Sequence, residues 1–238
     1  LRRQRQMCIR DSNNNNNKYP DLFYINLKHR KDRKTHLEGE LNNIGYPPDK
    51  ITRIEATKHD IGLTGCLLSH INALKHGLKS PDNYIIILED DFTWKYDKDK
   101  VNSILTQCLN CQDDWNVILL SKNGESEDYN EFLEKVVQSQ TTSGYIIKKR
   151  YIPTLLKLWE DNAKIRLKYN ICLNKSYKQY TDNNTAIDIL WKKLQHDKWY
   201  VTKPVLGKQM ESYSDIQKKN VNYGCLLYTS DAADEEDS

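Results

Sequence analysis

Three consecutive acids, Glu89, Asp90 and Asp91, directly follow an apolar run and could hold a divalent metal ion. The run Tyr84–Leu88 has no formal charge and three consecutive Ile, which is typical of a strand buried on both faces of a parallel sheet. Ligands of open α/β sheets bind at the carboxyl ends of the strands, where adjacent carboxylates repel one another unless a cation lies among them. A hard divalent ion that also holds substrate phosphates would suit these oxygens. The alternative is a solvated acidic strand end.

A second cluster, with Asn26, Arg30, Asp32 and Arg33, follows an earlier apolar run, residues 22–27. Backbone amides at a helix start attract anions, and arginine binds phosphate through two parallel hydrogen bonds. Asn26 and Asp32 could hold a base or a ribose. The alternative is a solvated basic helix start.

A third cluster places Cys66, Ser69 and His70 on a helix face apart from the apolar stripe that includes Leu67 and Leu74. Ser69 and His70 could donate hydrogen bonds to a ligand. Cys66 and His70 have the i,i+4 spacing of a nucleophile and its base, but no third residue in the sequence is placed to orient the histidine. The alternative is that His70 is a hydrogen-bonded structural residue.

Asp188 is a single acid in the otherwise apolar run 186–191. Burying a carboxylate is costly, and partial burial would raise its pKa toward the range useful for a general base. The alternative is an exposed i,i+4 ion pair with Lys192.

These clusters need a scaffold that brings strand ends together. Alternating patterns predict strands at residues 22–27, 51–56, 84–88, 115–120, 143–147 and 200–206. Helical spacing predicts helices at 32–44, 65–78 with Thr64 as the cap, 98–109, 152–161 and 185–194. Strands that alternate with helices favour the α/β class, with a mostly parallel central sheet flanked by helices in a single domain.

Composition excludes several classes of protein. The net charge is +3, which does not predict a nucleic-acid partner. The sequence contains no run of 18 apolar residues, so no transmembrane segment is predicted. We expect a cytoplasmic protein that could work at a membrane surface. The six cysteines show no disulfide framework, and the motif Cys108–Cys111 has no second pair to complete a zinc site.

The two ends are expected to be non-native. Residues 7–12 and 225–230 are what two DNA strings would encode that are reverse complements over most of their length and resemble a transposase end sequence used in sequencing libraries. We therefore expect residues 1–20 to be an adapter-like leader with an Asn-rich segment, 21–224 to be the functional domain, and 225–238 to be an adapter-like tail.

The order of the motifs resembles glycosyltransferase family 25, which includes lipooligosaccharide and collagen hydroxylysine galactosyltransferases. The resemblance covers roughly residues 21–219. It rests on the motifs Phe23–Leu27 with Arg30, Asp32 and Arg33; Gly65-Cys66 with Leu68-Ser69-His70; Leu88–Asp91; Ser143–Ile147; Ala186–Asp188; and Ser214–Ile216.

The resemblance implies a GT-A fold, a UDP-sugar donor and transfer of a hexose, galactose or glucose, with inversion. It implies that Glu89, Asp90 and Asp91 hold Mn²⁺ or Mg²⁺ between the donor phosphates, with Asp91 as the main ligand. Glu89 and Asp91 would project to one side of an extended chain and Asp90 to the other. Asn26, Arg30, Asp32 and Arg33 would bind the donor nucleotide, Asp188 would deprotonate the acceptor, and Gln209 and Asp215 could close over the donor.

The acceptor would be a hydroxyl of a glycan, glycolipid or protein, with residues 123–140 as an acceptor loop. Two other classes remain open from the residues alone. One is a non-catalytic protein that binds nucleotide sugars or glycans with the same fold. The other is a metal-dependent phosphoester hydrolase, which usually needs more clustered Asp and His ligands than these motifs supply.

Overall fold

The computed structural model describes residues 19–221 except 112–113, 171–184, 211 and 215–218. Within this part of the chain, one eight-stranded sheet has the strand order β2-β1-β3-β8-β5-β9-β7-β6. The strands are β1 (Leu22–Asn26), β2 (Ile51–Glu55), β3 (Tyr84–Glu89), β5 (Val117–Leu119), β6 (Asn123–Asp128), β7 (Leu133–Gln140), β8 (Gly144–Lys148) and β9 (Trp199–Thr202). The α/β single-domain class expected from the sequence is confirmed.

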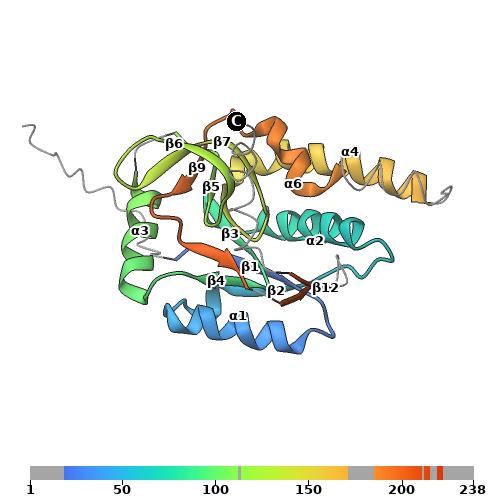
Figure 1. Ribbon diagram of the computed structural model, residues 1–238, viewed down its shortest axis with the longest axis horizontal. Helices are drawn as coiled ribbons and strands as arrows, with labels where there is room; N and C mark the ends of the chain where they lie inside the picture. The colour runs from blue at the N-terminus through green and yellow to red at the C-terminus, as the bar shows by residue number, and fades with distance from the viewer. Residues whose placement is uncertain (1–18, 112–113, 171–184, 211, 215–218, 222–238) are drawn as a thin grey trace, which may run out of the picture.

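Helices cover both faces of this sheet (Figure 1). The α-helices are α1 (Lys31–Asn43), α2 (Gly62–Gly77), α3 (Lys98–Asn110), α4 (Ile152–Asn170) and α6 (Ile187–Leu190), and the 3₁₀ helices are Pro48–Lys50, Lys149–Tyr151 and Trp191–Leu194. Two small sheets pair β4 (Phe92–Trp94) with β10 (Gly207–Gln209) and β11 (Ser212–Ser214) with β12 (Lys219–Val221).

Strand direction in the large sheet is mixed. The strand β1 pairs in parallel with β2 and β3, and β5 pairs in parallel with β9. The strands β8 and β7 run antiparallel to their neighbours. The remaining strands share one direction, so the carboxyl ends of β1, β2 and β3 meet at one edge.

The position of β3 between two layers of helices explains its three consecutive Ile residues. Ile85 and Ile87 pack into the core beneath α2, α4 and α6, whereas Ile86 and Leu88 pack into the core beneath α1 and α3. Alternate side chains of a strand point to opposite faces, so a strand with helices on both faces needs apolar residues at every position. The prediction that this strand is buried on both faces is confirmed.

Several predicted elements differ from the structure: the helix predicted at 152–161 extends to Asn170, and the strand predicted at 200–206 ends at Thr202. The helix α2 begins at Gly62 with Ile61 as its cap, so Thr64 is a buried residue inside the helix. Residues 123–140 form the β6–β7 hairpin at the edge of the sheet and not a loop, because the two strands pair along their length. The predicted helix 185–194 is a short α6 followed by a 3₁₀ helix.

Within the part of the chain that the structure describes, no helix is both long and apolar enough to cross a bilayer. The two ends that we expect to be non-native lie outside the described residues, apart from Tyr19 and Pro20.

Candidate functional site

The acidic run lies where β3 turns into β4. Glu89 is the last residue of β3, and Asp90 and Asp91 form the turn that leads to Phe92. Because the chain turns after Glu89, the alternation expected for an extended chain does not continue. Asp90 and Asp91 both reach Arg33 of α1, while Glu89 reaches His70 of α2. Glu89 and Asp91 thus have different hydrogen-bond partners, but they lie close enough for the charge of Glu89 to raise the pKa of Asp91, and their projection to one side stays a prediction.

Asn26 connects the neighbouring strand end to this turn. The parallel pairing of β1 and β3 places Ile25 opposite Glu89, so Asn26 lies beside the acids. Its Nδ2 donates to Asp90 Oδ2 over 2.7 Å, and its Oδ1 accepts from Arg53 Nε over 3.0 Å. The Asn26 amide is thus engaged within the protein and positions Asp90.

Arg33 supplies positive charge to the turn. Its Nη1 lies 3.0 Å from Asp90 Oδ1 and 3.1 Å from Asp91 Oδ2, and all three side chains are buried. Sequence reasoning assigned Arg33 to the donor phosphates, but in this structure its charge faces the acids. Arginine at such a buried position stabilises carboxylates that would otherwise repel one another.

Arg30 and Asp32 form a separate pair. The Arg30 guanidinium lies 2.8 Å from Asp32 Oδ2, and the Asp32 side chain is 63% exposed. The hydrogen bond from Arg30 lowers the pKa of Asp32 to about 2. Asp32 is therefore a carboxylate open to solvent.

The two aspartates of the turn have raised pKa values. Burial, and next the charge of Glu89, raises the pKa of Asp91 to about 7, against the opposing effect of Arg33. Burial also raises the pKa of Asp90. Asp91 Oδ1 is buried and has no hydrogen-bond partner among the described residues. A buried, unsatisfied carboxylate oxygen beside other acids fits the ligand set of a hard divalent cation.

The environment of Glu89, which contacts α2, differs from that of Asp90 and Asp91. Its Oε1 accepts from Thr142 Oγ1 over 2.5 Å and lies 3.1 Å from His70 Nε2. Burial alone would raise the pKa of Glu89, but the hydrogen bond and charge of His70, together with Thr142, lower it.

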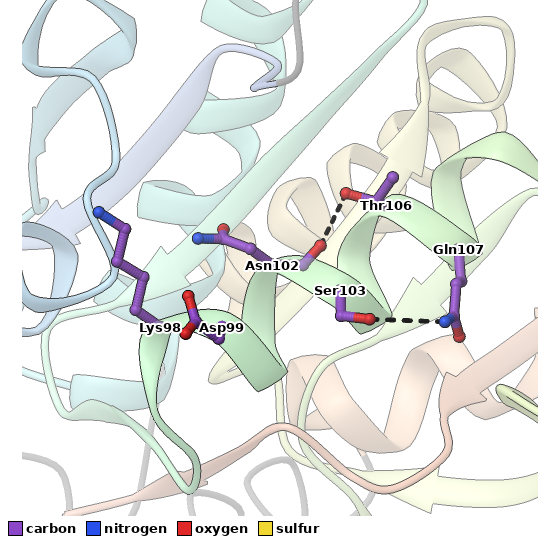
Figure 2. Close-up of a pocket in the computed structure, with 6 residues that line it drawn as sticks. All are labelled: Lys98, Asp99, Asn102, Ser103, Thr106 and Gln107. Atoms are coloured by element: carbon purple, nitrogen blue, oxygen red, sulfur yellow. Dashed lines mark hydrogen bonds between the residues drawn. The ribbon is translucent and has the colours of Figure 1, made fainter.

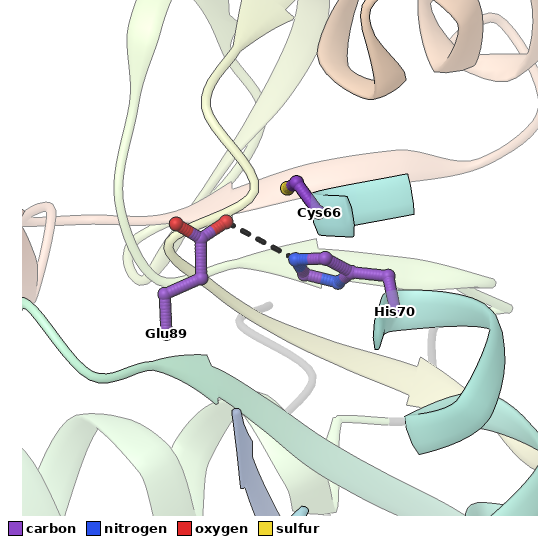
Figure 3. A group of neighbouring side chains, drawn as sticks. All are labelled: Cys66, His70 and Glu89. Carbon is purple, nitrogen blue, oxygen red and sulfur yellow. Dashed lines mark hydrogen bonds and ion pairs between the residues drawn. The ribbon is translucent and has the colours of Figure 1, made fainter. Parts of the chain in front are cut away.

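His70 is completely buried and held on several sides. Its Nδ1 lies 3.1 Å from the Tyr145 hydroxyl, its ring stacks on Tyr145, and its edge faces Trp159. Figure 3 shows Cys66, one helical turn before His70, beside the contact between His70 and Glu89. The sequence offered no third group for Cys66 and His70; the structure supplies Glu89, because β3 ends beside α2.

Ser69 takes a structural position. Its hydroxyl donates to the Gly65 carbonyl over 2.6 Å and accepts from the Thr57 amide over 2.8 Å. Gly65 is required there, since a Cβ would lie 2.6 Å from the Thr57 carbonyl oxygen. The hydroxyl expected to meet a ligand instead joins α2 to the segment after β2.

Thr141 was missed by sequence reasoning. It lies between β7 and β8, with a φ of 78°, which is unusual for a β-branched residue and is often found at functional sites. Its amide donates to Asp188 Oδ2 over 3.3 Å, and its hydroxyl donates to Gln209 Oε1 over 3.2 Å. The available signal was the polar run 141–143 just before a buried strand.

Asp188 and Gln209 reach the same region from the C-terminal part of the chain. Burial raises the pKa of Asp188, against hydrogen bonds from Thr141 and from the start of α6. Lys192 contacts Gln138 instead, so the alternative pair of Asp188 with Lys192 is not observed. Gln209 lies close enough to Asp91 to lower its pKa, and the β4–β10 pairing positions it. Asp215 lies outside the described residues.

A surface hollow of about 430 Å³ lies elsewhere, along α3 (Figure 2). Its lining residues all come from this helix: Lys98, Asp99, Asn102, Ser103, Thr106 and Gln107. Several of these side chains bond within their own helix, such as Thr106 to the Asn102 carbonyl. The hollow contains none of the strand-end acids, and we do not assign the site to it.

Solved structures that are similar to this chain share little sequence with it. No protein-family model and no curated protein matches the chain. The structure is similar to A197 from STIV, with 12% identity over 85% of this chain and 93% of that chain and a TM-score of 0.42. It is similar to mannose-1-phosphate geranyltransferase from Thermus thermophilus, with 14% identity over 78% of this chain and 73% of that chain and a TM-score of 0.44.

A third similar structure is a glycosyltransferase involved in the glycosylation of the major capsid of PBCV-1. The identity is 11% over 77% of this chain and 92% of that chain, with a TM-score of 0.37. At such low identities and TM-scores, these similarities establish neither a family nor an activity for this chain.

Proposed function

We propose that the protein is a divalent-metal-dependent glycosyltransferase that moves a hexose from a UDP-sugar to a hydroxyl of a glycan, glycolipid or protein. The observation that carries the proposal is the buried turn Asp90–Asp91, where Asp91 Oδ1 has no partner among the described residues. The turn lies at the carboxyl ends of parallel strands, where α/β proteins bind ligands. The order of motifs that resembles family 25 favours sugar transfer over other metal chemistry.

Asp91 and Asp90 would hold the cation, Mn²⁺ or Mg²⁺, with Glu89 as a further ligand only if it leaves His70. A bound divalent cation would offset the negative charge that develops on the departing nucleoside diphosphate. Arg33 already lies within 3.1 Å of both aspartates, so it would share these acids with the cation and add positive charge beside the phosphates.

Asp188 is the candidate base for the acceptor hydroxyl. Its raised pKa suits a carboxylate that must accept a proton, and its hydrogen bond from the Thr141 amide fixes its direction. Deprotonation of the acceptor on the face opposite the leaving group gives inversion. Asp32, which is exposed, would orient the nucleoside from the β1 side, and Asn26 would hold Asp90 in place.

The test is release of UDP by the full chain from a panel of UDP-sugars, with and without Mn²⁺. We expect metal-dependent release from one sugar, UDP-galactose or UDP-glucose, and its loss by a factor of roughly 100 to 1,000 in Asp91→Ala. Asp128→Ala is the control, because Asp128 is an exposed acid at the end of the distant strand β6. Its side chain pairs with Lys203.

Full UDP release by a folded Asp91→Ala variant would contradict the metal role of Asp91. Metal-dependent binding of UDP-sugars without release, even with acceptor glycans added, would favour a non-catalytic binding protein. Release of phosphate in place of UDP would favour a hydrolase.

A further inference from the structure

We propose that Cys66, His70 and Glu89 form a second metal site, selective for a borderline transition metal ion such as Zn²⁺ or Co²⁺. One ligand atom from each residue lies within 4.8 Å of the other two. Cys66 and His70 come from adjacent turns of α2, and Glu89 comes from the end of β3 (Figure 3). This inference does not depend on the proposed transferase activity.

The ligand types distinguish this site from the Asp90–Asp91 turn. Thiolate and imidazole prefer zinc-like ions, whereas sites made only of carboxylates prefer magnesium or manganese. Glu89 faces His70 and Thr142, while Asp90 and Asp91 face Arg33, so the two sets of ligands point to different neighbours. The two sets of ligands would therefore prefer cations of different chemistry.

The spacing is close to that of a bound site. Tetrahedral zinc, with bonds of about 2.3 Å to sulfur and about 2.0 Å to nitrogen, places its ligand atoms about 3.5 Å apart. Closing from 4.8 Å needs a movement of roughly 1 Å, which side-chain rotation of Cys66 and Glu89 can provide. Both residues are partly exposed, which leaves a path for the ion and a fourth position for water or substrate.

The residues behind the ligands already orient them. Thr142 donates to Glu89 Oε1, and the Tyr145 hydroxyl faces His70 Nδ1. A hydroxyl can donate or accept a hydrogen bond, so Tyr145 can accept one from Nδ1–H when Nε2 binds the ion. Metal-binding histidines usually donate their second ring N–H to such a partner, which sets the tautomer.

The experiment measures alkylation of cysteines in the reduced full chain by iodoacetamide, followed by peptide mass spectrometry. We expect Zn²⁺ to slow the alkylation of Cys66 at least tenfold, because a metal-bound thiolate is shielded from the reagent. Cys111, which is partly exposed at the end of α3, is the control in the same sample. An excess of Mg²⁺ should leave the rate at Cys66 unchanged.

A second measurement uses Co²⁺, whose thiolate complexes absorb in the near ultraviolet. We expect the absorption of the wild-type chain and of Cys111→Ser to indicate one more cobalt–thiolate bond than that of Cys66→Ser. Equal alkylation of Cys66 with and without Zn²⁺ in the wild type would overturn the proposal, whether or not the variant folds. Neither readout measures sugar transfer, so failure of the transferase proposal would leave this result intact.

Discussion

The two faces of the β3 strand end treat their carboxylates in opposite ways. On the α2 face, one carboxylate oxygen of Glu89 accepts a hydrogen bond from Thr142 and also contacts His70 Nε2. These contacts lower the pKa of Glu89 in spite of its burial. On the α1 face, Asp91 shares one guanidinium with Asp90 and keeps one oxygen without a partner among the described residues, and its pKa is raised to about 7. The acids are two residues apart, so neighbours and not depth decide the sign of the shift.

This difference separates the acids that can readily take up a proton from the one that cannot. Glu89 is already stabilised as an anion, so it has little affinity for a proton. Asp91 and Asp188 have raised pKa values and therefore gain more from a cation or from a transferred proton.

The role of Asp188 as the base can be tested by kinetics. Asp188→Asn should lower kcat roughly 100-fold and change the KM for the donor little, since a general base contributes through proton transfer. Steady-state kinetics at saturating acceptor would measure it. A large rise in donor KM with kcat unchanged would instead place Asp188 in the donor site.

A smaller effect tests the charge balance on the α1 face. Arg33→Met should lower the free energy of unfolding by about 3 kcal/mol, because two buried aspartates lose their cation. Urea denaturation of the metal-free protein would measure it. Added Mn²⁺ should restore more stability to this variant than to the wild type.

Arg150→Met is the matched control, because Arg150 pairs with Asp114 on the surface, where both side chains are more than half exposed. This substitution should lower the free energy of unfolding by less than about 1 kcal/mol. Equal losses in the two variants would mean that the pairing of Arg33 has no special energetic role.

The smallest effect is the pH dependence of stability. Between about pH 4 and about pH 7 the folded protein keeps a proton on Asp91 that the unfolded chain has released, so the Asp91 contribution to stability falls as pH rises through this window. Asp91→Asn removes this contribution. It should therefore melt several degrees higher than the wild type at pH 8, and the difference should shrink as the pH falls toward 4.5.

Thermal melts across this pH range, without divalent ions, would measure the difference. If Asp91→Asn melted lower than the wild type at pH 8, the Asp91 carboxylate would be a net stabilising anion like Glu89. The contrast between the two faces would then fail.

Much of the scaffold could be predicted from local patterns. Strands β1 and β3 and helices α1 and α3 lie within one or two residues of the predicted ranges, because their apolar spacing and stops are local signals. The β6–β7 hairpin could not be predicted, since its strands carry many polar residues and are defined by pairing with each other and with β9. Thr141 has no signal of its own beyond a polar run.

Local patterns in the sequence indicate which groups could do chemistry: the acids 89–91 and Arg33 follow predicted strands, and His70 and Asp188 lie in predicted helices. The partners of these groups depend on how the elements pack together. The turn after Glu89 sends Asp90 and Asp91 to Arg33, and the packing of α2 on β3 brings Cys66 and His70 to Glu89. Side-chain type is a local property, whereas hydrogen bonding, desolvation and pKa depend on residues brought together from distant parts of the chain.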